Sequence, residues 1–229
     1  MNDTLPTDLS ALDDASRLGV FDAPILGRTP DAELERLVAR ASEVSGFPIA
    51  LVTLVVEQIQ FFRAQVGLPP DLEASRATDR CSSFCQFVVA GDQPLRIEDS
   101  LLEPGLPTDL VERYGIRAYV GFPLRVAGKT VGSFCVIDAK PGRLEPAQLE
   151  ELSKLTQAAS ARLEMLAARW APPKNALEEK SHRAWIAVEE SHSLLSLAEQ
   201  FAAGRLTFEE FQRGLGALAT LAGALEARR

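Results

Sequence analysis

The 229-residue sequence predicts an α+β fold: a central antiparallel β-sheet with flanking helices, followed by a C-terminal α-helical hairpin. Three observations predict it. Continuously apolar, β-branched runs indicate strands that are buried on both faces. Two such runs flank a short glycine turn, which is the pattern of an antiparallel hairpin. Apolar residues spaced three and four apart indicate helices before and after these strands.

We expect the chain to divide into three segments. Residues 1–13 are polar and are expected to form a flexible N-terminus. Residues 14–171 contain the strands and the helices that flank them, and they form one domain of ordinary size. Two prolines, Pro172 and Pro173, interrupt the helical pattern, so the C-terminal hairpin is assigned to residues 172–229.

The first long helix is predicted between Thr29 and Gly46. Thr29 is the candidate N-cap, Pro30 suits the first helical position, and Gly46 suits the C-terminal end. The apolar face of this helix consists of Leu34, Leu37, Val38 and Ala41. The helical pattern ends at Gly46, and the continuously apolar segment Phe47–Val56 predicts a strand that is buried on both faces.

Four further strands are expected after this one. They are Gln60–Val66, Leu95–Glu98, Ala118–Val126 and Thr130–Ile137. The last two flank the glycine turn Ala127–Lys129 and form the predicted hairpin. Between the strands, Gly67–Thr78 contains two prolines and is expected to be a loop, whereas Ser82–Ala90 is expected to be a short helix.

Two sets of helices follow the sheet. A long helix is predicted for Ala147–Trp170, with apolar positions that alternate three and four apart. Beyond the proline pair, Ala176–Ala203 is expected to form the first helix of the hairpin. Thr207 caps the second helix, and Glu210 three residues later completes a capping box. The apolar seam of that second helix consists of Phe208, Phe211, Leu215, Leu218, Ala222 and Leu225.

The composition excludes several classes of function. The formal net charge is −8 and the pI is near 5.0, and no stretch gathers the basic residues of a nucleic-acid interface. No apolar run approaches the roughly 20 residues that cross a bilayer, and the acidic N-terminus does not resemble a signal peptide. We therefore expect a cytoplasmic protein that binds neither nucleic acid nor membrane.

The numbers and positions of the cysteines and histidines exclude further kinds of catalytic and metal site. Three cysteines without an export signal are expected to be free thiols in a reducing compartment. The two histidines, His182 and His192, both lie outside residues 14–171. A histidine-based metal site or a Cys–His nucleophile pair is therefore excluded from that domain.

Five segments of the sequence match a known family in order. They are PIALVTLV at Pro48–Val55, QFFRAQVGLP at Gln60–Pro69, SFCQFVV at Ser83–Val89, RAYVGFPL at Arg117–Leu124 and VGSFCVID at Val131–Asp138. Together they resemble the GAF family, in the branch common in bacterial signalling proteins, over about two-thirds of the chain. The resemblance implies a sheet with a ligand pocket on one face and terminal helices that often pair between protomers.

The sequence departs from that branch at three positions near the first two strands. Val56, Ile59 and Phe61 stand where an acidic residue, a basic residue and a tryptophan are frequent. The motif that accompanies cyclic-nucleotide binding, an Asn-Lys pair followed by Phe and Asp-Glu, is missing, and so is the Cys–His pair that holds a bilin. Neither activity is expected, and the identity of any cofactor stays unknown.

The resemblance and the strand pattern together suggest five ligand-binding residues, which are Arg117, Tyr119, Phe61, Asp99 and Phe84. In an alternating strand Arg117 and Tyr119 share one face, where they would suit an anionic or aromatic ligand. The alternative interpretation is that Arg117 and Tyr119 are surface residues at the start of the strand and bind no ligand. A loop over the expected pocket is flanked by three acidic residues, Asp99, Glu103 and Asp109. They could act as acid–base partners or simply be solvated surface residues, and their spacing matches no metal-binding loop.

Three residues, Cys81, Cys85 and Cys135, are the candidates for redox chemistry. Free methionine sulfoxide reductases are GAF enzymes that use cysteines around the pocket, and Cys81 and Cys85 would share a helix face at a spacing of four. Cys135 lies in an apolar strand, where a thiol behaves as a small hydrophobe. The surroundings of these cysteines do not match the reductase signature, so we expect no enzyme activity and no catalytic residue.

Two functions follow, with the reductase as a third. The first is a GAF sensor or adaptor that binds a small molecule or a partner protein and relays its state through its helices. The second is a ligand-free scaffold used for dimerisation. Fewer than sixty residues follow Pro173, so the output is expected to be a signalling partner protein. A homodimer through terminal helices is also expected, because Leu149, Leu163 and Trp170 widen the apolar stripe of the long helix.

Overall fold

The computed structural model describes residues 5–21, 23–27, 29–168, 194, 197–198 and 200–226. Within them, a six-stranded sheet has the order β3-β2-β1-β6-β5-β4, and every neighbouring pair is antiparallel. The strands are β1 Ile49–Val55, β2 Ile59–Val66, β3 Ala77–Asp79, β4 Leu95–Ile97, β5 Ala118–Val126 and β6 Lys129–Asp138. The predicted α+β class with a central antiparallel sheet is confirmed.

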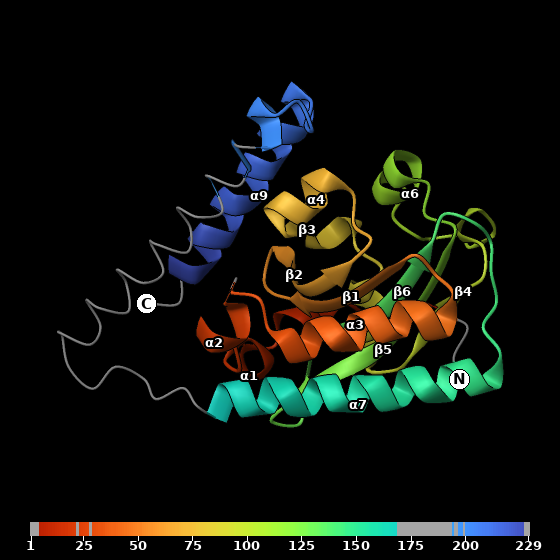
Figure 1. The fold of residues 1–229 in the computed structure, drawn as a ribbon. Helices are drawn as coiled ribbons and strands as arrows, with labels where there is room; N and C mark the ends of the chain where they lie inside the picture. The colour runs from red at the N-terminus through yellow and green to blue at the C-terminus, as the bar shows by residue number, and fades with distance from the viewer. Residues whose placement is uncertain are drawn as a thin grey trace, which may run out of the picture.

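Helices surround this sheet (Figure 1). The α-helices are α1 Ala15–Leu18, α2 Ala23–Leu26, α3 Ala32–Ser45, α4 Pro70–Ser75, α5 Cys85–Gly91, α6 Asp109–Tyr114, α7 Pro146–Ala168 and α9 Phe208–Glu226. The 3-10 turns are η1 Ser10–Asp13, η2 Arg80–Ser82 and η3 Ser100–Leu102. Among the helices described, none has the length and apolar character needed to cross a membrane.

A hydrophobic core lies on each face of the sheet. Helices α3 and α7 run side by side over one face (Figure 1), where the buried residues include Leu34, Val38, Val52, Phe134, Leu152 and Leu163. Helix α5 and the turn η1 cover the other face, where the buried residues include Leu12, Leu51, Phe87, Val88 and Tyr119. Successive strand side chains enter opposite cores, which explains why the strands are continuously apolar.

Two predicted elements are corrected by the structure. The N-cap of α3 is Asp31 rather than Thr29, and its side chain accepts hydrogen bonds from the N–H groups of Glu33 and Leu34. The predicted loop at 67–78 contains α4 and the start of β3. Pro70 occupies the first position of α4, where its missing N–H costs no helical hydrogen bond.

The N-terminal segment packs onto the domain. Leu12 of η1 is 1% exposed within the second core. Arg17 of α1 donates from Nη2 to the carbonyl of Leu12 and from Nη1 to the carbonyl of Val55 over 2.6 Å. The expectation of a flexible N-terminus is therefore wrong for Ser10–Asp13.

Helix α9 begins with the predicted capping box. The N–H of Thr207 donates to Glu210 Oε2 over 2.7 Å, and the N–H of Glu210 donates to Thr207 Oγ1 over 3.2 Å. The helix contacts α4 and β3, and a small buried cluster there consists of Ala74, Leu197, Leu206 and Leu218. The predicted first helix of the hairpin, Ala176–Ala203, lies largely outside the described residues.

Helix α7 buries two residues of its apolar stripe, Leu149 and Leu163, inside the domain. Leu149 and Leu163, which widen the stripe and predict a dimer, are 9% and 0% exposed within the core under α3 and α7. Trp170 lies outside the described residues. Packing inside the domain therefore explains why these two positions are apolar, without contact with a second copy of the chain. The homodimer stays a prediction.

Asp31 also joins α3 to α7 through a buried ion pair. Arg162 of α7 donates from Nη2 to Asp31 Oδ2 over 2.8 Å, and the two side chains are 18% and 6% exposed. Burial acts to raise the pKa of Asp31, but hydrogen bonds from Arg162 and the N–H of Leu34 outweigh it and lower that pKa. The ionised carboxylate therefore stabilises the fold above its unfolded pKa, and this contribution is lost as the pH falls through the folded pKa.

Replacing Asp31 with asparagine should lower the free energy of unfolding by about 1–3 kcal/mol near neutral pH. The amide can still cap α3, but it leaves Arg162 without its buried anion. This loss of stability should become smaller as the pH falls below about 3.8, the ordinary pKa of an aspartate, because the wild-type carboxylate then becomes protonated as well. Urea titrations at both pH values measure this difference.

The matched control is Glu43→Gln, which removes an exposed ion pair with Arg40 on the same helix. It should change stability by less than about 1 kcal/mol at either pH. A deficit for Asp31→Asn that is equally large in acid would contradict the role assigned to the carboxylate charge.

Candidate functional site

The sheet face under α5 is where Tyr119 and Phe84 meet. Their rings pack edge to face with centroids 5.6 Å apart. The prediction that Tyr119 faces away from Ala118 and Val120 is confirmed, because those two residues lie in the opposite core. Tyr119 is 1% exposed and Phe84 is 4% exposed, so both side chains fill the centre of this face.

Two cysteines lie beside the Tyr119 hydroxyl. Cys85, the first residue of α5, and Cys135 of β6 have Sγ atoms 3.9 Å apart. Tyr119 donates its O–H to Cys85 Sγ over 3.3 Å, and its oxygen lies 3.1 Å from Ser133 Oγ. A side chain at position 121 would overlap the Tyr119 hydroxyl, so Gly121 provides the space for this arrangement.

Burial sets the direction of the pKa shift for Tyr119 and Cys135, but not for Cys85. It raises the pKa of Tyr119 well above its ordinary value, and the neighbouring cysteines add to the shift. Burial likewise raises the pKa of Cys135. For Cys85, burial opposes ionisation, but hydrogen bonds from Cys135, Thr53, Tyr119 and Ser83 act against it and lower the pKa. Cys85 is therefore the more acidic of the two thiols.

Arg117 and Asp99 bind each other at the edge of the sheet. Nε and Nη2 of Arg117 donate to the two carboxylate oxygens of Asp99 over 2.8 and 2.7 Å. The hydrogen bond from Arg117, with a further one from the N–H of Leu101, lowers the pKa of Asp99. This bidentate pairing neutralises the cation that the sequence suggests for an anionic ligand.

Phe61 lies on the sheet face opposite Tyr119. It is fully buried under α3 and α7, and the Arg76 guanidinium lies 5.8 Å from its ring centroid. Val56 and Ile59 are buried in the same core, which explains why apolar residues suit these positions. The five suggested ligand-binding residues therefore do not converge: two fill one face, two pair at its edge and one packs in the other core.

Cys81 is separate from the other two cysteines. It is exposed in η2, whereas Cys85 is 2% exposed at the start of α5. The prediction that Cys81 and Cys85 share a helix face is wrong, because the extended backbone of Ser83 separates η2 from α5.

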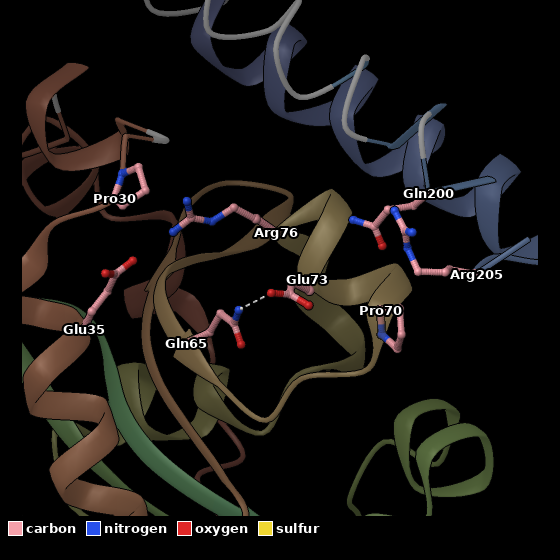
Figure 2. Close-up of a pocket in the computed structure, with 8 residues that line it drawn as sticks. All are labelled: Pro30, Glu35, Gln65, Pro70, Glu73, Arg76, Gln200 and Arg205. Atoms are coloured by element: carbon pink, nitrogen blue, oxygen red, sulfur yellow. Dashed lines mark hydrogen bonds between the residues drawn. The ribbon is translucent and has the colours of Figure 1, made fainter. Parts of the chain in front are cut away.

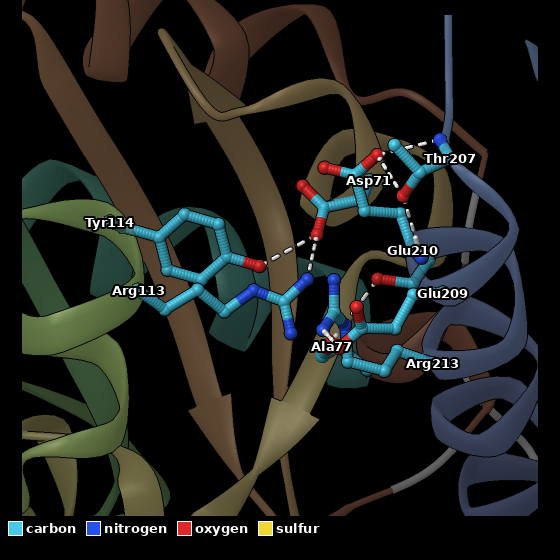
Figure 3. Close-up of polar contacts among 9 residues, drawn as sticks. Asp71, Ala77, Arg113, Tyr114, Thr207, Glu209, Glu210 and Arg213 are labelled. Atoms are coloured by element: carbon cyan, nitrogen blue, oxygen red, sulfur yellow. Dashed lines mark hydrogen bonds and ion pairs between the residues drawn. The ribbon is translucent and has the colours of Figure 1, made fainter. Parts of the chain in front are cut away.

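A cavity of about 460 Å³ lies where α9 meets the domain, between α4, β3, α6 and α9. In its wall, Asp71 accepts hydrogen bonds from Arg113 Nη2 over 2.8 Å and from the Tyr114 hydroxyl over 2.7 Å (Figure 3). Burial and the Asp71 carboxylate raise the pKa of Tyr114, so its hydroxyl remains a donor. Arg213 of α9 lines the same cavity and pairs with Glu209 over 2.7 Å.

A second cavity, of about 530 Å³, lies nearer the start of α3. Figure 2 shows its charged and polar lining, which includes Glu35, Arg76 and Arg205. Gln65 donates to Glu73 over 3.2 Å within it. Because Arg205 precedes α9, this cavity too is bounded by the domain and by the C-terminal segment.

The sequence model of the GAF domain family matches residues 29–163, more than half of the chain. The chain belongs to the GAF family. A cyclic di-GMP phosphodiesterase of Pseudomonas aeruginosa is 33% identical over 154 residues, which cover 64% of this chain and 25% of that protein. The chain thus spans about a quarter of the length of this relative.

Two solved structures are similar to the GAF domain. A domain of a protein assigned as a two-component sensor histidine kinase, from Sinorhizobium meliloti, has a TM-score of 0.51 and 17% identity, covering 62% of this chain and 96% of that domain. The GAF domain of an Acinetobacter phosphoenolpyruvate-protein phosphotransferase has a TM-score of 0.49 and 14% identity, covering 70% and 99%. The first of these likenesses shows the fold alone.

The junction of the GAF domain with α9 is the part of the site that sequence reasoning missed. Asp71 and Arg113 are 42 positions apart, and Asp71 falls in a segment predicted as a loop. No local motif joins them. The apolar seam of α9 was the available signal, since its member Leu218 is buried in the cluster that includes Ala74 of α4.

Proposed function

We propose that this GAF chain is a sensory adaptor without enzyme activity, in which a small polar ligand at the α9 junction changes how α9 packs and a partner protein detects the change. The observation that carries the proposal is the 460 Å³ cavity, whose walls come from the GAF domain and from α9 together. A ligand that contacts both walls favours one arrangement of them over another, and so shifts the position of the helix.

The lining of this cavity suits a small molecule with groups of both charges. Arg113 and Arg213 each pair with a carboxylate through one guanidinium nitrogen, which leaves further N–H donors for a ligand. Asp79 and Asp109 supply carboxylates, and the side-chain oxygen of Thr78 is buried without a hydrogen-bond partner among the described residues. Buried polar atoms are ordinarily paired, so this oxygen is available to a ligand or a water molecule. A zwitterionic compound of amino-acid size would match these groups.

The surface proposed for the partner is an aromatic cluster at the start of α9, made of Phe201, Phe208 and Phe211. Phe201 stacks on Phe211 with centroids 4.7 Å apart, while Phe208 is 63% exposed. Exposed aromatic groups are enriched in protein interfaces. The related phosphodiesterase carries its matching region within a longer signalling enzyme, which supports an enzyme of signalling as the partner.

The alternative is a ligand-free scaffold, with a homodimer as its assembled form. It is favoured by the filling of the sheet face, where Tyr119 and Phe84 occupy the centre. The reductase alternative is disfavoured because its substrate is large: methionine sulfoxide would have to reach thiols that are only 2% and 1% exposed at Cys85 and Cys135, which a reactant no larger than a water molecule or two can approach more easily.

Native mass spectrometry of the freshly purified chain tests the sensor. We expect a co-purified small molecule that Arg213→Met loses, since this variant removes a cation from the α9 wall but only an exposed ion pair from the helix. Hydrogen exchange in α9 should be several-fold faster once the molecule is removed, because the bound ligand connects the helix to the domain.

Arg40→Met is the matched control, because Arg40 also pairs with a glutamate on its own helix but lies on α3, outside the residues that line this cavity. It should retain the molecule. A chain that carries no ligand, and whose α9 exchange no amino acid or dicarboxylate slows, would favour the ligand-free scaffold instead.

A further inference from the structure

The two buried cysteines form a close pair at the centre of the sheet. Their Sγ atoms are 3.9 Å apart, and they come from α5 and β6, which are otherwise joined by apolar packing. A disulfide needs a sulfur separation of about 2.05 Å, so α5 and β6 would have to approach by roughly 2 Å in total. A short helix packed on a sheet can make a shift of that size by local adjustment.

Polar side chains converge on the Cys85 sulfur. Tyr119 donates to it over 3.3 Å, and Gln60 donates from Nε2 over 3.5 Å. Gln60 is 4% exposed, and its Oε1 atom has no hydrogen-bond partner among the described residues. Placing these polar groups in a core costs free energy that an aliphatic side chain would avoid. Simple packing of a small hydrophobe therefore does not account for the arrangement.

The hydrogen-bond donors around the two cysteines give their thiols different reactivity. Hydrogen bonds to sulfur favour its thiolate, which is the nucleophilic form, and they gather on Cys85. Cys135 contacts Cys85 and lies in β6, one strand from Tyr119 in β5. A more acidic thiol beside a second thiol is the arrangement in which oxidation of the first is followed by attack of the second.

We propose that Cys85 and Cys135 are an oxidisable dithiol that a hydroperoxide converts to an intramolecular disulfide between α5 and β6. The Cys85 sulfur attacks a peroxide oxygen, the O–O bond breaks, and Cys85 becomes a sulfenic acid with release of water. The Cys135 sulfur then attacks the Cys85 sulfur, the S–O bond breaks, and hydroxide leaves with the Cys135 proton as a second water. Two thiols lose two electrons in all, and hydrogen peroxide accepts them.

This dithiol is independent of the ligand proposed at the α9 junction. Closing the disulfide would pull α5 toward β6 and remove the sulfur acceptor of the Tyr119 hydroxyl. Helix α5 also contacts η1, so the N-terminal segment would move with it. The oxidised and reduced chains are therefore expected to differ around η1.

The test uses the full chain carrying Cys81→Ser, which removes the exposed thiol. After treatment of the folded protein with hydrogen peroxide, both remaining thiols should disappear together, and the intact mass should fall by two hydrogens. Peptide mapping should find Cys85 linked to Cys135, and dithiothreitol should restore both thiols. Adding Cys135→Ala should stop the reaction at a Cys85 sulfenic acid, trapped by dimedone.

Tyr119→Phe, also in the Cys81→Ser chain, keeps the ring and removes the donor. It should slow thiol loss about tenfold, the size expected of one hydrogen bond to a charged group. Thiols that survive peroxide treatment sufficient to oxidise Cys81 in the unmodified chain would overturn the proposal, as would oxidation of either cysteine without the disulfide. If Cys135→Ala does not fold, the mapped disulfide in the Cys81→Ser chain decides the question alone.

Discussion

Replacing Leu163 with glutamate is expected to unfold the GAF domain. Leu163 of α7 is fully buried in the core between α3, α7 and the sheet. Losing a buried leucine side chain costs about 2–5 kcal/mol, and an unpaired carboxylate in its place costs several kcal/mol more. Domains are stabilised by about 5–15 kcal/mol in total, so the two losses are comparable with the whole. Circular dichroism should show no cooperative melt.

Two variants make this result interpretable. Met165→Glu changes a 51% exposed side chain on the same helix and should alter stability by less than about 0.5 kcal/mol. Leu163→Ala should fold but unfold at a lower urea concentration. If Leu163→Glu instead keeps its cooperative melt and light scattering shows a dimer becoming a monomer, residue 163 faces a second copy and its placement in the core is wrong.

The elements that sequence predicted well are those with long patterns of their own. Strand β1 and the hairpin of β5 and β6 consist of extended apolar runs bounded by turn residues, and the capping box of Thr207 lies within four consecutive residues. Helix α4 is six residues long and carries no full apolar period, and β3 is a three-residue strand held by pairing with β2. Such short elements depend on tertiary contacts that no local pattern contains.

The candidate site was predicted only in part for a related reason. Alternation along β5 correctly placed Tyr119 on the face away from Ala118. Whether that face is open or filled depends on Phe84 and Cys85 at the start of α5, and Cys85 lies 34 positions before Tyr119 in the chain. Phe61 was assigned to the site from its place in the family pattern, and its strand presents it to the other core.

Replacing Gly132 with alanine should lower the free energy of unfolding by about 3 kcal/mol, the upper end of the usual cost of overpacking, and it should reduce the yield of folded protein. Gly132 lies in β6 between β1 and β5, where it pairs with Leu54 and Leu124. A methyl group at this position would overlap the backbone carbonyl of Thr53. A backbone atom in a central strand cannot rotate away as the end of a flexible side chain can, so the sheet itself would have to separate.

Gly128→Ala is the control that separates this clash from the general cost of replacing glycine. Gly128 lies in the turn between β5 and β6, where an added methyl group meets nothing within 4 Å but the backbone has a φ of +73°. That left-handed conformation should cost about 1–2 kcal/mol for alanine. Chemical unfolding of both variants gives the comparison. If Gly132→Ala proves no more destabilising than Gly128→Ala, the strands can separate at Thr53 without loss, and the close approach of β1 to β6 does not require glycine.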